Sequence, residues 1–131
     1  MSDSPVLEAW HRVVADADPV GLDALLADDA VFNSPAVHAP QRGKVLTRAY
    51  LSAAFAVLGP TLTYHRTWER PQSAILEFTA DLDGTAVHGV DIITWNDDDL
   101  ICDFTVMVRP FRGLEAVIAR MSAQLEQMSE G

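Results

Sequence analysis

Two adjoining runs of alternating residues between positions 73 and 95 limit what this chain can fold into more than any other feature. In the first run, apolar and polar side chains alternate from Leu76 to Leu82. A period of two is typical of a β-strand with one buried face. Asp83-Gly84 separates the two runs, and this dipeptide favours the tight turn of a β-hairpin. The pattern therefore predicts two long antiparallel strands.

Helical and strand patterns divide the rest of the chain. Asp3 and Ser4 are candidate caps of a first helix, and Pro110 ends the last predicted strand. Clusters of Pro, Gly, Asn and Asp separate the segments between them. The predicted elements are a helix within 2–18, a short second helix that leads into a strand at 31–33, a loop over 34–43, a helix over 45–58, a strand over 61–69, the hairpin, a strand over 100–110 and a final helix with apolar positions from 114 to 128.

Helices first and antiparallel strands later is the element order of an α+β fold. The helices can cover only one face of the sheet, yet the second hairpin strand is apolar on both faces. Ile93 and Trp95 share one face, while Val90 and Ile92 share the other. We therefore expect one domain over 1–131, with the N-terminal helices in the concave face of a curved, mainly antiparallel sheet. The convex face is expected to form a homodimer.

The charge balance excludes several classes of partner. Nine Lys and Arg residues against nineteen Asp and Glu residues give a formal net charge of −10. Such a chain repels phosphate groups, so we expect neither nucleic acid nor a membrane as a partner. The single cysteine, Cys102, allows no internal disulfide, and the sequence shows neither a signal peptide nor a transmembrane run, which favours the cytoplasm. Without metal-ligand spacing or a glycine-rich phosphate loop, we expect no metal and no cofactor.

Three stretches resemble segments of the nuclear-transport-factor-2-like superfamily, and in particular its SnoaL-like (polyketide-cyclase-like) and ketosteroid-isomerase-like members. They are LDALLADDAVFNSPAV at 22–37, RGKVLTRAYLSAAF at 42–55 and VHGVDIITWNDDDLICDFTVMVRP at 87–110. The resemblance implies an NTF2-like cone, also described as an α+β barrel. It is less informative about chemistry, because the superfamily contains isomerases, cyclases, epoxide hydrolases, dehydratases and proteins without activity.

Matching functional residues one by one narrows the chemistry. A ketosteroid-isomerase-like site implies a tyrosine on the first helix, a base carboxylate before the proline that follows the first strand, and an acid in the penultimate strand. These positions fall on Trp10, Ser34 and Asp91, so only the acid is present. An epoxide-hydrolase-like Asp–Arg–Asp arrangement is also absent, because Gly89 and Ile93 flank Asp91 on its face. The isomerase reaction itself is therefore disfavoured.

Asp91 is the strongest candidate for a functional residue. On the inner face of its strand it would be buried, and burial raises a carboxyl pKa and leaves a neutral acid that donates to a carbonyl or enolate oxygen. The structural alternative is an inert Asp91, hydrogen-bonded to Trp10 or to a backbone amide. His38 lies in a loop at the expected pocket rim, where it is either a weaker candidate base or a solvent-exposed residue.

Alternation also assigns faces on two other strands. It places Tyr64, Arg66 and Trp68 together on one face, where aromatic side chains more often pack than catalyse. On the last strand it places Ile101 and Asp103 on an outer, dimer-forming face, opposite an apolar set that forms the core or the pocket wall. These assignments decide which side chains could reach a ligand.

Together the patterns predict a small cone that encloses an apolar pocket for a hydrophobic small molecule. Cofactor-free acid–base catalysis of the cyclase or isomerase type on a carbonyl compound is one prediction, with Asp91 as the acid. A non-catalytic ligand-binding or dimerisation module is the alternative, because a convincing second acid–base group is missing. The candidate catalytic residues are Asp91 and His38, and the candidate ligand-binding residues are Trp10, Val14, Phe32, Ser34, Phe55, Tyr64, Phe78, Ile93, Trp95 and Phe104.

Overall fold

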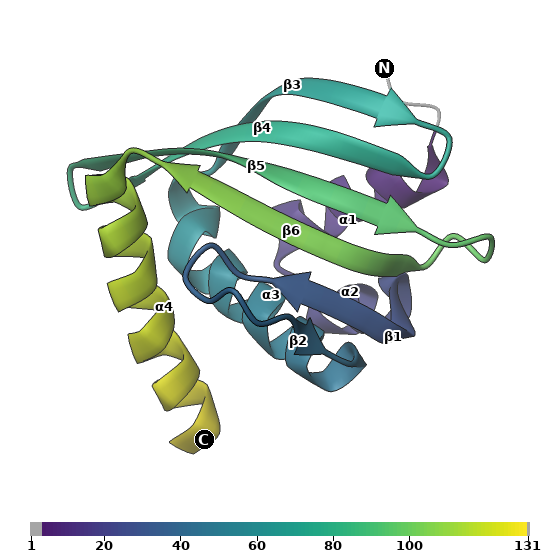
Figure 1. Cartoon of the computed structure of the whole chain (residues 1–131), viewed down its shortest axis with the longest axis horizontal. Helices are drawn as coiled ribbons and strands as arrows, with labels where there is room; N and C mark the ends of the chain where they lie inside the picture. The colour runs from purple at the N-terminus through teal and green to yellow at the C-terminus, as the bar shows by residue number, and fades with distance from the viewer. Residues whose placement is uncertain (1–3, 131) are drawn as a thin grey trace.

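The computed structural model describes residues 4–130, which form four α-helices, one short 3-10 helix and six β-strands. The strands make one open sheet in the order β2-β1-β6-β5-β4-β3 (Figure 1). β1 and β6 run parallel, and the other neighbouring strands run antiparallel. The elements are α1 (Pro5–Asp16), α2 (Pro19–Leu25), β1 (Leu26–Asn33), β2 (Gln41–Arg42), α3 (Lys44–Leu58), the 3-10 helix η1 (Gly59–Thr61), β3 (Thr63–Arg70), β4 (Ser73–Leu82), β5 (Thr85–Trp95), β6 (Ile101–Arg109) and α4 (Phe111–Glu130).

The first helix begins where its capping residues predict. Ser4 is the N-cap, and its Oγ accepts a hydrogen bond from the Leu7 N–H at 3.3 Å. Pro5 occupies the first helical turn, where its missing N–H has no helical partner to lose. Ala17 ends the helix in a left-handed conformation with φ of 47°. The other predicted cap, Asp3, lies outside the described residues.

The predicted hairpin is confirmed by β4 and β5. Asp83 and Gly84 both have positive φ angles, 54° and 92°, as a two-residue hairpin turn requires. The two strands then pair without interruption from Leu82 opposite Thr85 to the far end of β4. Along β5, alternate side chains are buried toward the helices, and Asp91 is one of the buried set. The helical residues therefore cover the face to which the alternation assigned Asp91.

The predicted alternation fails on β3. From Tyr64 to Thr67 the strand advances three residues while its partner β4 advances two, which defines a β-bulge. A bulge reverses the alternation of the side chains beyond it. Tyr64 therefore faces the helices, while Arg66 contacts Glu77 on the opposite face. The prediction that Tyr64, Arg66 and Trp68 share one face is wrong.

A second bulge lies in β6. Between Ile101 and Asp103 this strand advances two residues while β5 advances one. Cys102 is the inserted residue, and its thiol donates to the carbonyl oxygen of Thr94 at 3.5 Å. Ile101 consequently turns inward and is fully buried. The prediction that Ile101 and Asp103 share an outer face is wrong for the same reason.

The region around β1 is more extended than its sequence pattern indicates. The strand begins at Leu26 instead of 31, because Leu26 pairs with Ile101 on the parallel neighbour β6. The segment predicted as a loop over 34–43 also contains the two-residue strand β2, which pairs with β1. Both differences come from the pairing of β1 with distant or short segments. A local sequence pattern contains no information about such pairing.

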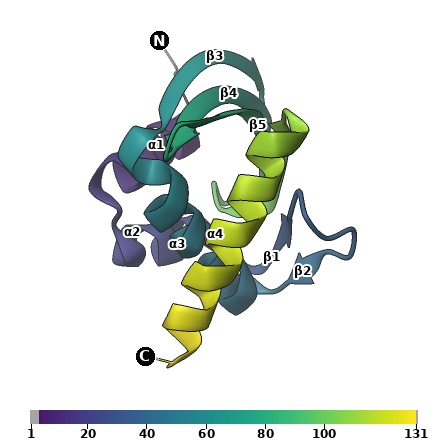
Figure 2. The same cartoon turned by 90° about the vertical axis from the view of Figure 1, so that its left-hand side faces the viewer.

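The helices occupy one side of the curved sheet. α1, α2 and α3 pack in its concave face, and α4 runs across the open side and contacts α3, β5 and β6 (Figure 2). Trp10, Phe78 and Phe104 are the largest of the fully buried side chains. This arrangement confirms the α+β fold predicted for the chain. Within residues 4–130, none of the helices combines the length and the apolar character needed to cross a membrane.

Candidate functional site

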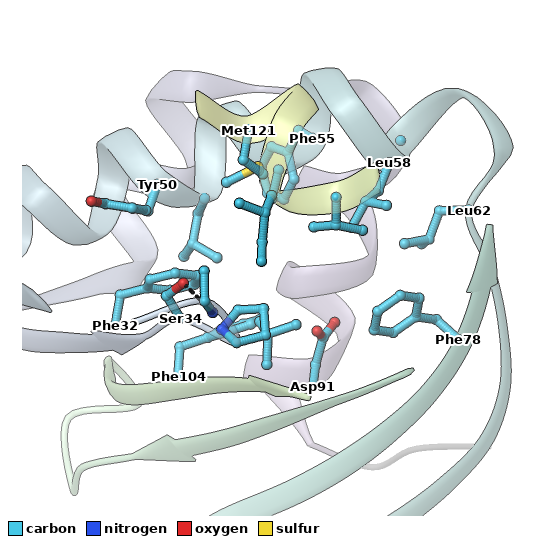
Figure 3. Close-up of a pocket in the computed structure, with 18 of the residues that line it drawn as sticks. Phe32, Ser34, Tyr50, Phe55, Leu58, Leu62, Phe78, Asp91, Phe104 and Met121 are labelled. Carbon is cyan, nitrogen blue, oxygen red and sulfur yellow. Dashed lines mark hydrogen bonds between the residues drawn. The ribbon is translucent and has the colours of Figure 1, made fainter. Parts of the chain in front are cut away.

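A cavity opens between the concave face of the sheet and the helices (Figure 3). It encloses about 940 Å³, including open solvent at its mouth. Aliphatic and aromatic side chains make up most of its lining, and Asp91 is the one residue that β5 contributes. The lining residues that carry a side-chain oxygen are Ser34, Tyr50, Tyr64, Asp91 and Ser122.

Most of the predicted ligand-binding residues lie around this cavity. Ile93 and Trp95 are the exceptions, since the cavity reaches β5 only at Asp91 and both side chains lie farther along the strand in the closed core. His38 is exposed in the loop between β1 and β2 and does not line the cavity. The eight candidates that line it are Trp10, Val14, Phe32, Ser34, Phe55, Tyr64, Phe78 and Phe104.

Two hydrogen bonds in series end at Asp91, which is 5% exposed. The indole Nε1–H of Trp10 donates to the hydroxyl oxygen of Tyr64 at 3.1 Å. The Tyr64 hydroxyl in turn donates to Oδ2 of Asp91 at 2.7 Å. Trp10 therefore reaches Asp91 through Tyr64, in place of the direct hydrogen bond considered above.

Burial dominates the electrostatics of this pair. Removal from water raises the pKa of Asp91 to about 7, and the hydrogen bond from Tyr64 opposes that rise. The pKa of Tyr64 is raised well above its ordinary value, first by burial and then by the neighbouring Asp91 charge. Tyr64 therefore stays a neutral donor, while Asp91 changes between a neutral acid and a carboxylate near neutral pH.

Phe78 closes the cavity wall beside Asp91. A Cβ atom at Gly89 would lie 2.7 Å from Cζ of Phe78 and 2.3 Å from the carbonyl oxygen of Met107. Because only glycine leaves this space, the ring of Phe78 can lie close to β5, two residues from Asp91. A glycine inside a strand is a sign of such a close approach.

The three positions that the isomerase resemblance implies can now be compared with the structure. Trp10 occupies the helix position expected for tyrosine, but a phenol still reaches Asp91, from Tyr64 on β3. The expected base position has no carboxylate, and the Ser34 Oγ accepts a hydrogen bond from the Ala36 N–H at 3.0 Å. Among the described residues that line the cavity, Asp91 is the one carboxylic acid, and there is no histidine.

Sequence reasoning missed the contribution of α4 and of Tyr50. The apolar positions of α4 were visible as a helical stripe, but the sequence did not show what they pack against. In the structure Val117, Ile118, Met121 and Leu125 line the cavity. Tyr50 of α3 also lines it, stacked on Phe32 with 5.3 Å between ring centroids.

The outer face of the sheet carries a separate ionic network. Glu77 is 8% exposed and accepts hydrogen bonds from Arg66 Nε at 2.6 Å and Nη2 at 2.9 Å. His88 Nε2 lies 2.8 Å from Glu77, and Arg109 Nη1 lies 3.1 Å from His88 Nδ1. Bonds from Arg66 are the main cause that lowers the pKa of Glu77 to about 2. His88 thus faces away from Asp91, as expected for residues three positions apart on one strand. Within residues 4–130, no three His, Cys, Asp or Glu side chains are grouped to hold a metal ion.

Comparison with known proteins gives one family match. Residues 7–104 match the model of a SnoaL-like domain, and this range includes Trp10, Tyr64 and Asp91. No curated protein matches the chain. The sequence resemblance to SnoaL-like proteins is therefore supported by an independent family model.

Solved structures extend the similarity to nearly the whole chain. A steroid delta-isomerase from Pseudomonas aeruginosa is 36% identical, with a TM-score of 0.90 over 96% of this chain and 93% of that one. An uncharacterized protein with a cystatin-like fold from Silicibacter pomeroyi is 29% identical, with a TM-score of 0.89 over 98% and 90%. A Mycobacterium tuberculosis protein in complex with estradiol-17beta-hemisuccinate is 24% identical, with a TM-score of 0.63 over 82% and 100%.

Proposed function

Because this chain belongs to the SnoaL-like domain family, we propose that its cavity binds a hydrophobic small molecule through a carbonyl oxygen. The observation that carries the proposal is a single buried carboxyl group, Asp91, in a cavity whose lining is mostly aliphatic and aromatic. As a neutral acid it would donate a hydrogen bond to the carbonyl oxygen, while the aromatic walls bury the rest of the molecule. The steroid delta-isomerase and the estradiol-17beta-hemisuccinate complex among the similar structures support this ligand type.

Acid catalysis of the cyclase type is the reaction that a lone acid serves best. A nucleophile within the substrate forms a bond to the carbonyl carbon, the π electrons move to oxygen, and Asp91 protonates that oxygen. The proton released by the nucleophile then returns to the Asp91 carboxylate. An isomerase-type proton shift needs in addition a base at the carbon, and Ser34, at the expected base position, is not a base near neutral pH. We assign no role to His38, which lies outside the cavity lining.

A variant that fills the cavity tests the binding proposal. Fluorenone, a flat apolar ketone, should raise the melting temperature of the wild-type protein. Ala54 lines the cavity, so Ala54→Trp should remove this rise. We expect at least about a tenfold loss of affinity, because the new indole occupies the ligand's space. Ala56→Trp is the matched control, since Ala56 is exposed on the same helix. Equal stabilisation of both variants by fluorenone would contradict binding in this cavity.

A non-catalytic binding module is the second candidate function. It is favoured by one observation, the lack of a second acid–base group among the described residues of the cavity lining. The two functions differ in the fate of a bound carbonyl compound, which an enzyme converts and a binding module returns unchanged. Product analysis after incubation with carbonyl compounds that carry an internal nucleophile distinguishes them.

We also propose that a second copy of the chain covers the outer face of the sheet. Trp68 and Ile75 lie opposite each other there, and Ile75 lies opposite Ile92. Met107 is 55% exposed and lies opposite Val90. On a chain with a net charge of −10, self-association needs a patch with balanced charge. The ionic network of Arg66, Glu77, His88 and Arg109 gives this face such a balance.

A charge placed on this face should separate the two copies. Met107→Glu would bury an unpaired carboxylate in the interface, so the dimer dissociation constant should rise about 100-fold or more. Sedimentation velocity over a range of protein concentrations measures this change. Val20→Glu is the control, because Val20 is 77% exposed on α2, away from the sheet. A wild-type protein that is monomeric at every concentration would exclude the proposed interface. So would a dimer whose dissociation constant is unchanged by Met107→Glu.

A further inference from the structure

The hydrogen bonds that lead to Asp91 have a fixed direction. An indole N–H can donate but cannot accept, so Trp10 must donate and Tyr64 Oη must accept. The indole ring has little freedom to turn away, because Trp10 is 2% exposed. Its centroid lies 4.9 Å from that of Phe104 and 5.5 Å from that of Phe55. The donor at the start of this series is therefore held in place by packing.

The direction continues through Tyr64 to Asp91. A phenol has one proton, and with its oxygen accepting from Trp10 that proton is directed to Oδ2 of Asp91 at 2.7 Å. Oδ2 is consequently an acceptor whether Asp91 is ionised or neutral. When Asp91 is neutral, its own proton therefore lies on Oδ1, the oxygen that does not accept from Tyr64, and the Asp91 carboxyl group points into the cavity (Figure 3). The site then presents a donor to the ligand at Oδ1, and the hydroxyl oxygen that carries this proton is a poorer acceptor than a carboxylate oxygen.

We propose that Trp10 and Tyr64 are positioning residues that hold the Asp91 proton on Oδ1. As a consequence, the cavity binds a ligand with a hydrogen-bond acceptor oxygen more tightly than a ligand of the same shape that has only a hydrogen-bond donor. The inference rests on the proposed function, since it concerns how the same anchor recognises its ligand. It adds the residues that determine whether acceptor or donor ligands are preferred. Ketones and enones fit this anchor, whereas a ring N–H or another pure donor leaves two protons facing each other.

Among the side chains around Asp91, Tyr64 is the one that interacts with its carboxyl group. Asp91 lies opposite Leu76 on β4 and Val106 on β6, neither of which titrates. Tyr64 is the one charged or titratable side chain of the described residues that shifts the Asp91 pKa. His11 on α1 meets the Tyr64 ring edge-on, with 5.3 Å between centroids, and its own pKa is lowered by burial. A change in the ionisation of Asp91 is therefore transmitted to Trp10 through the Tyr64 hydroxyl.

A ligand-free measurement tests the series itself. In ¹⁵N-labelled wild-type protein, the Trp10 indole N–H signal should shift with pH as Asp91 titrates, because Tyr64 connects the two groups. The shift should vanish in Tyr64→Phe and in Asp91→Asn. Trp68, which is 50% exposed, supplies a reference signal, and Trp10→Phe assigns the spectrum. A Trp10 chemical shift that does not change with pH in the wild type, or that still titrates in Tyr64→Phe, overturns the proposal.

A matched pair of probes tests selectivity. Fluorenone and carbazole have the same three-ring outline, but one offers an acceptor oxygen and the other a donor N–H. Titration calorimetry at about pH 6 should show the wild type preferring fluorenone by about tenfold or more. Tyr64→Phe should bring the two affinities within about threefold, because the Asp91 carboxyl group can then turn an acceptor oxygen toward carbazole. Ala56→Trp, the control at an exposed position of α3 outside the cavity lining, should leave the ratio unchanged.

The outcomes separate this inference from the proposed function. Fluorenone that binds with the same preference in Tyr64→Phe as in the wild type contradicts the inference and leaves the proposed function standing. Failure of both probes to bind the wild type contradicts the proposed function. In that case the indole signal alone decides whether Trp10 and Tyr64 control Asp91, because it needs no ligand.

Discussion

The Asp91→Asn variant should be more stable than the wild-type protein at high pH, by up to about 4 kcal/mol. Burial raises the pKa of Asp91 from 3.8 to about 7, so the folded protein binds this proton more tightly than the unfolded chain. The stability linked to it is fully present below the unfolded pKa and is lost as pH rises through the folded pKa near 7. Asparagine keeps an acceptor for Tyr64 and has no charge to bury, so the variant does not show this loss.

Urea unfolding of both proteins across the pH range measures the difference. At about pH 3 the two free energies of unfolding should agree within about 1 kcal/mol, and the gap should open between about pH 4 and pH 7 and then stay constant. All other titrating groups are common to both proteins and largely cancel in the comparison. An Asp91 whose ionised form stabilises the fold predicts the opposite sign, with Asp91→Asn the less stable protein at about pH 9.

The second large effect is a loss of ketone affinity at high pH. Above the pKa of Asp91 the ionised carboxylate has no proton to donate and repels a carbonyl oxygen. With that pKa at about 7, the fluorenone dissociation constant should rise about tenfold per pH unit above this value, or about 100-fold by about pH 9. Below about pH 6 it should be constant, since Asp91 is then neutral.

Asp91→Asn is the control for this pH dependence. An amide donates at every pH, so fluorenone binding to the variant should be independent of pH over the same range. Calorimetric titrations of both proteins in matched buffers supply the comparison. Wild-type affinity that stays constant to about pH 9, or an equal decrease in both proteins, would show that Asp91 does not anchor the ketone.

Local signals were sufficient to predict much of the fold. Ser4 and Pro5 act within one helical turn, and Asp83-Gly84 sets its own backbone angles, so the first helix and the hairpin follow from short stretches. The alternation along β5 likewise places Asp91 on the buried face. In each of these cases the residues that decide the structure are neighbours in the sequence.

The predictions that failed concern features that depend on pairing between distant segments. The bulges in β3 and β6 come from strand register, and one inserted residue leaves no mark on an alternating pattern. The bond between Tyr64 and Asp91 joins residues 27 apart, and the bulge after Tyr64 separates its face from that of Arg66. From sequence, Tyr64 was placed as a wall residue, whereas in the structure it also orients the acid.

The cavity itself was only partly predictable. Four of its aromatic residues follow from the inward faces of α1, β1, β4 and β6, namely Trp10, Phe32, Phe78 and Phe104. Its far wall is α4, and helical spacing shows an apolar stripe without showing which surface the stripe covers. The same gap explains why Ile93 and Trp95 were expected in the wall, since the end of the cavity at Asp91 depends on how the helices meet the sheet.

The most direct test of the central claim, that Asp91 anchors a ketone as a neutral acid, is the titration of its carboxyl carbon by ¹³C NMR. Asp91→Asn assigns the signal, and the titration is repeated with the cavity saturated by fluorenone. We predict a midpoint at about 7 in the free protein, moved upward by fluorenone because the ketone binds the neutral form. A midpoint close to the ordinary value of 3.8, or one that fluorenone leaves in place or lowers, would contradict the claim.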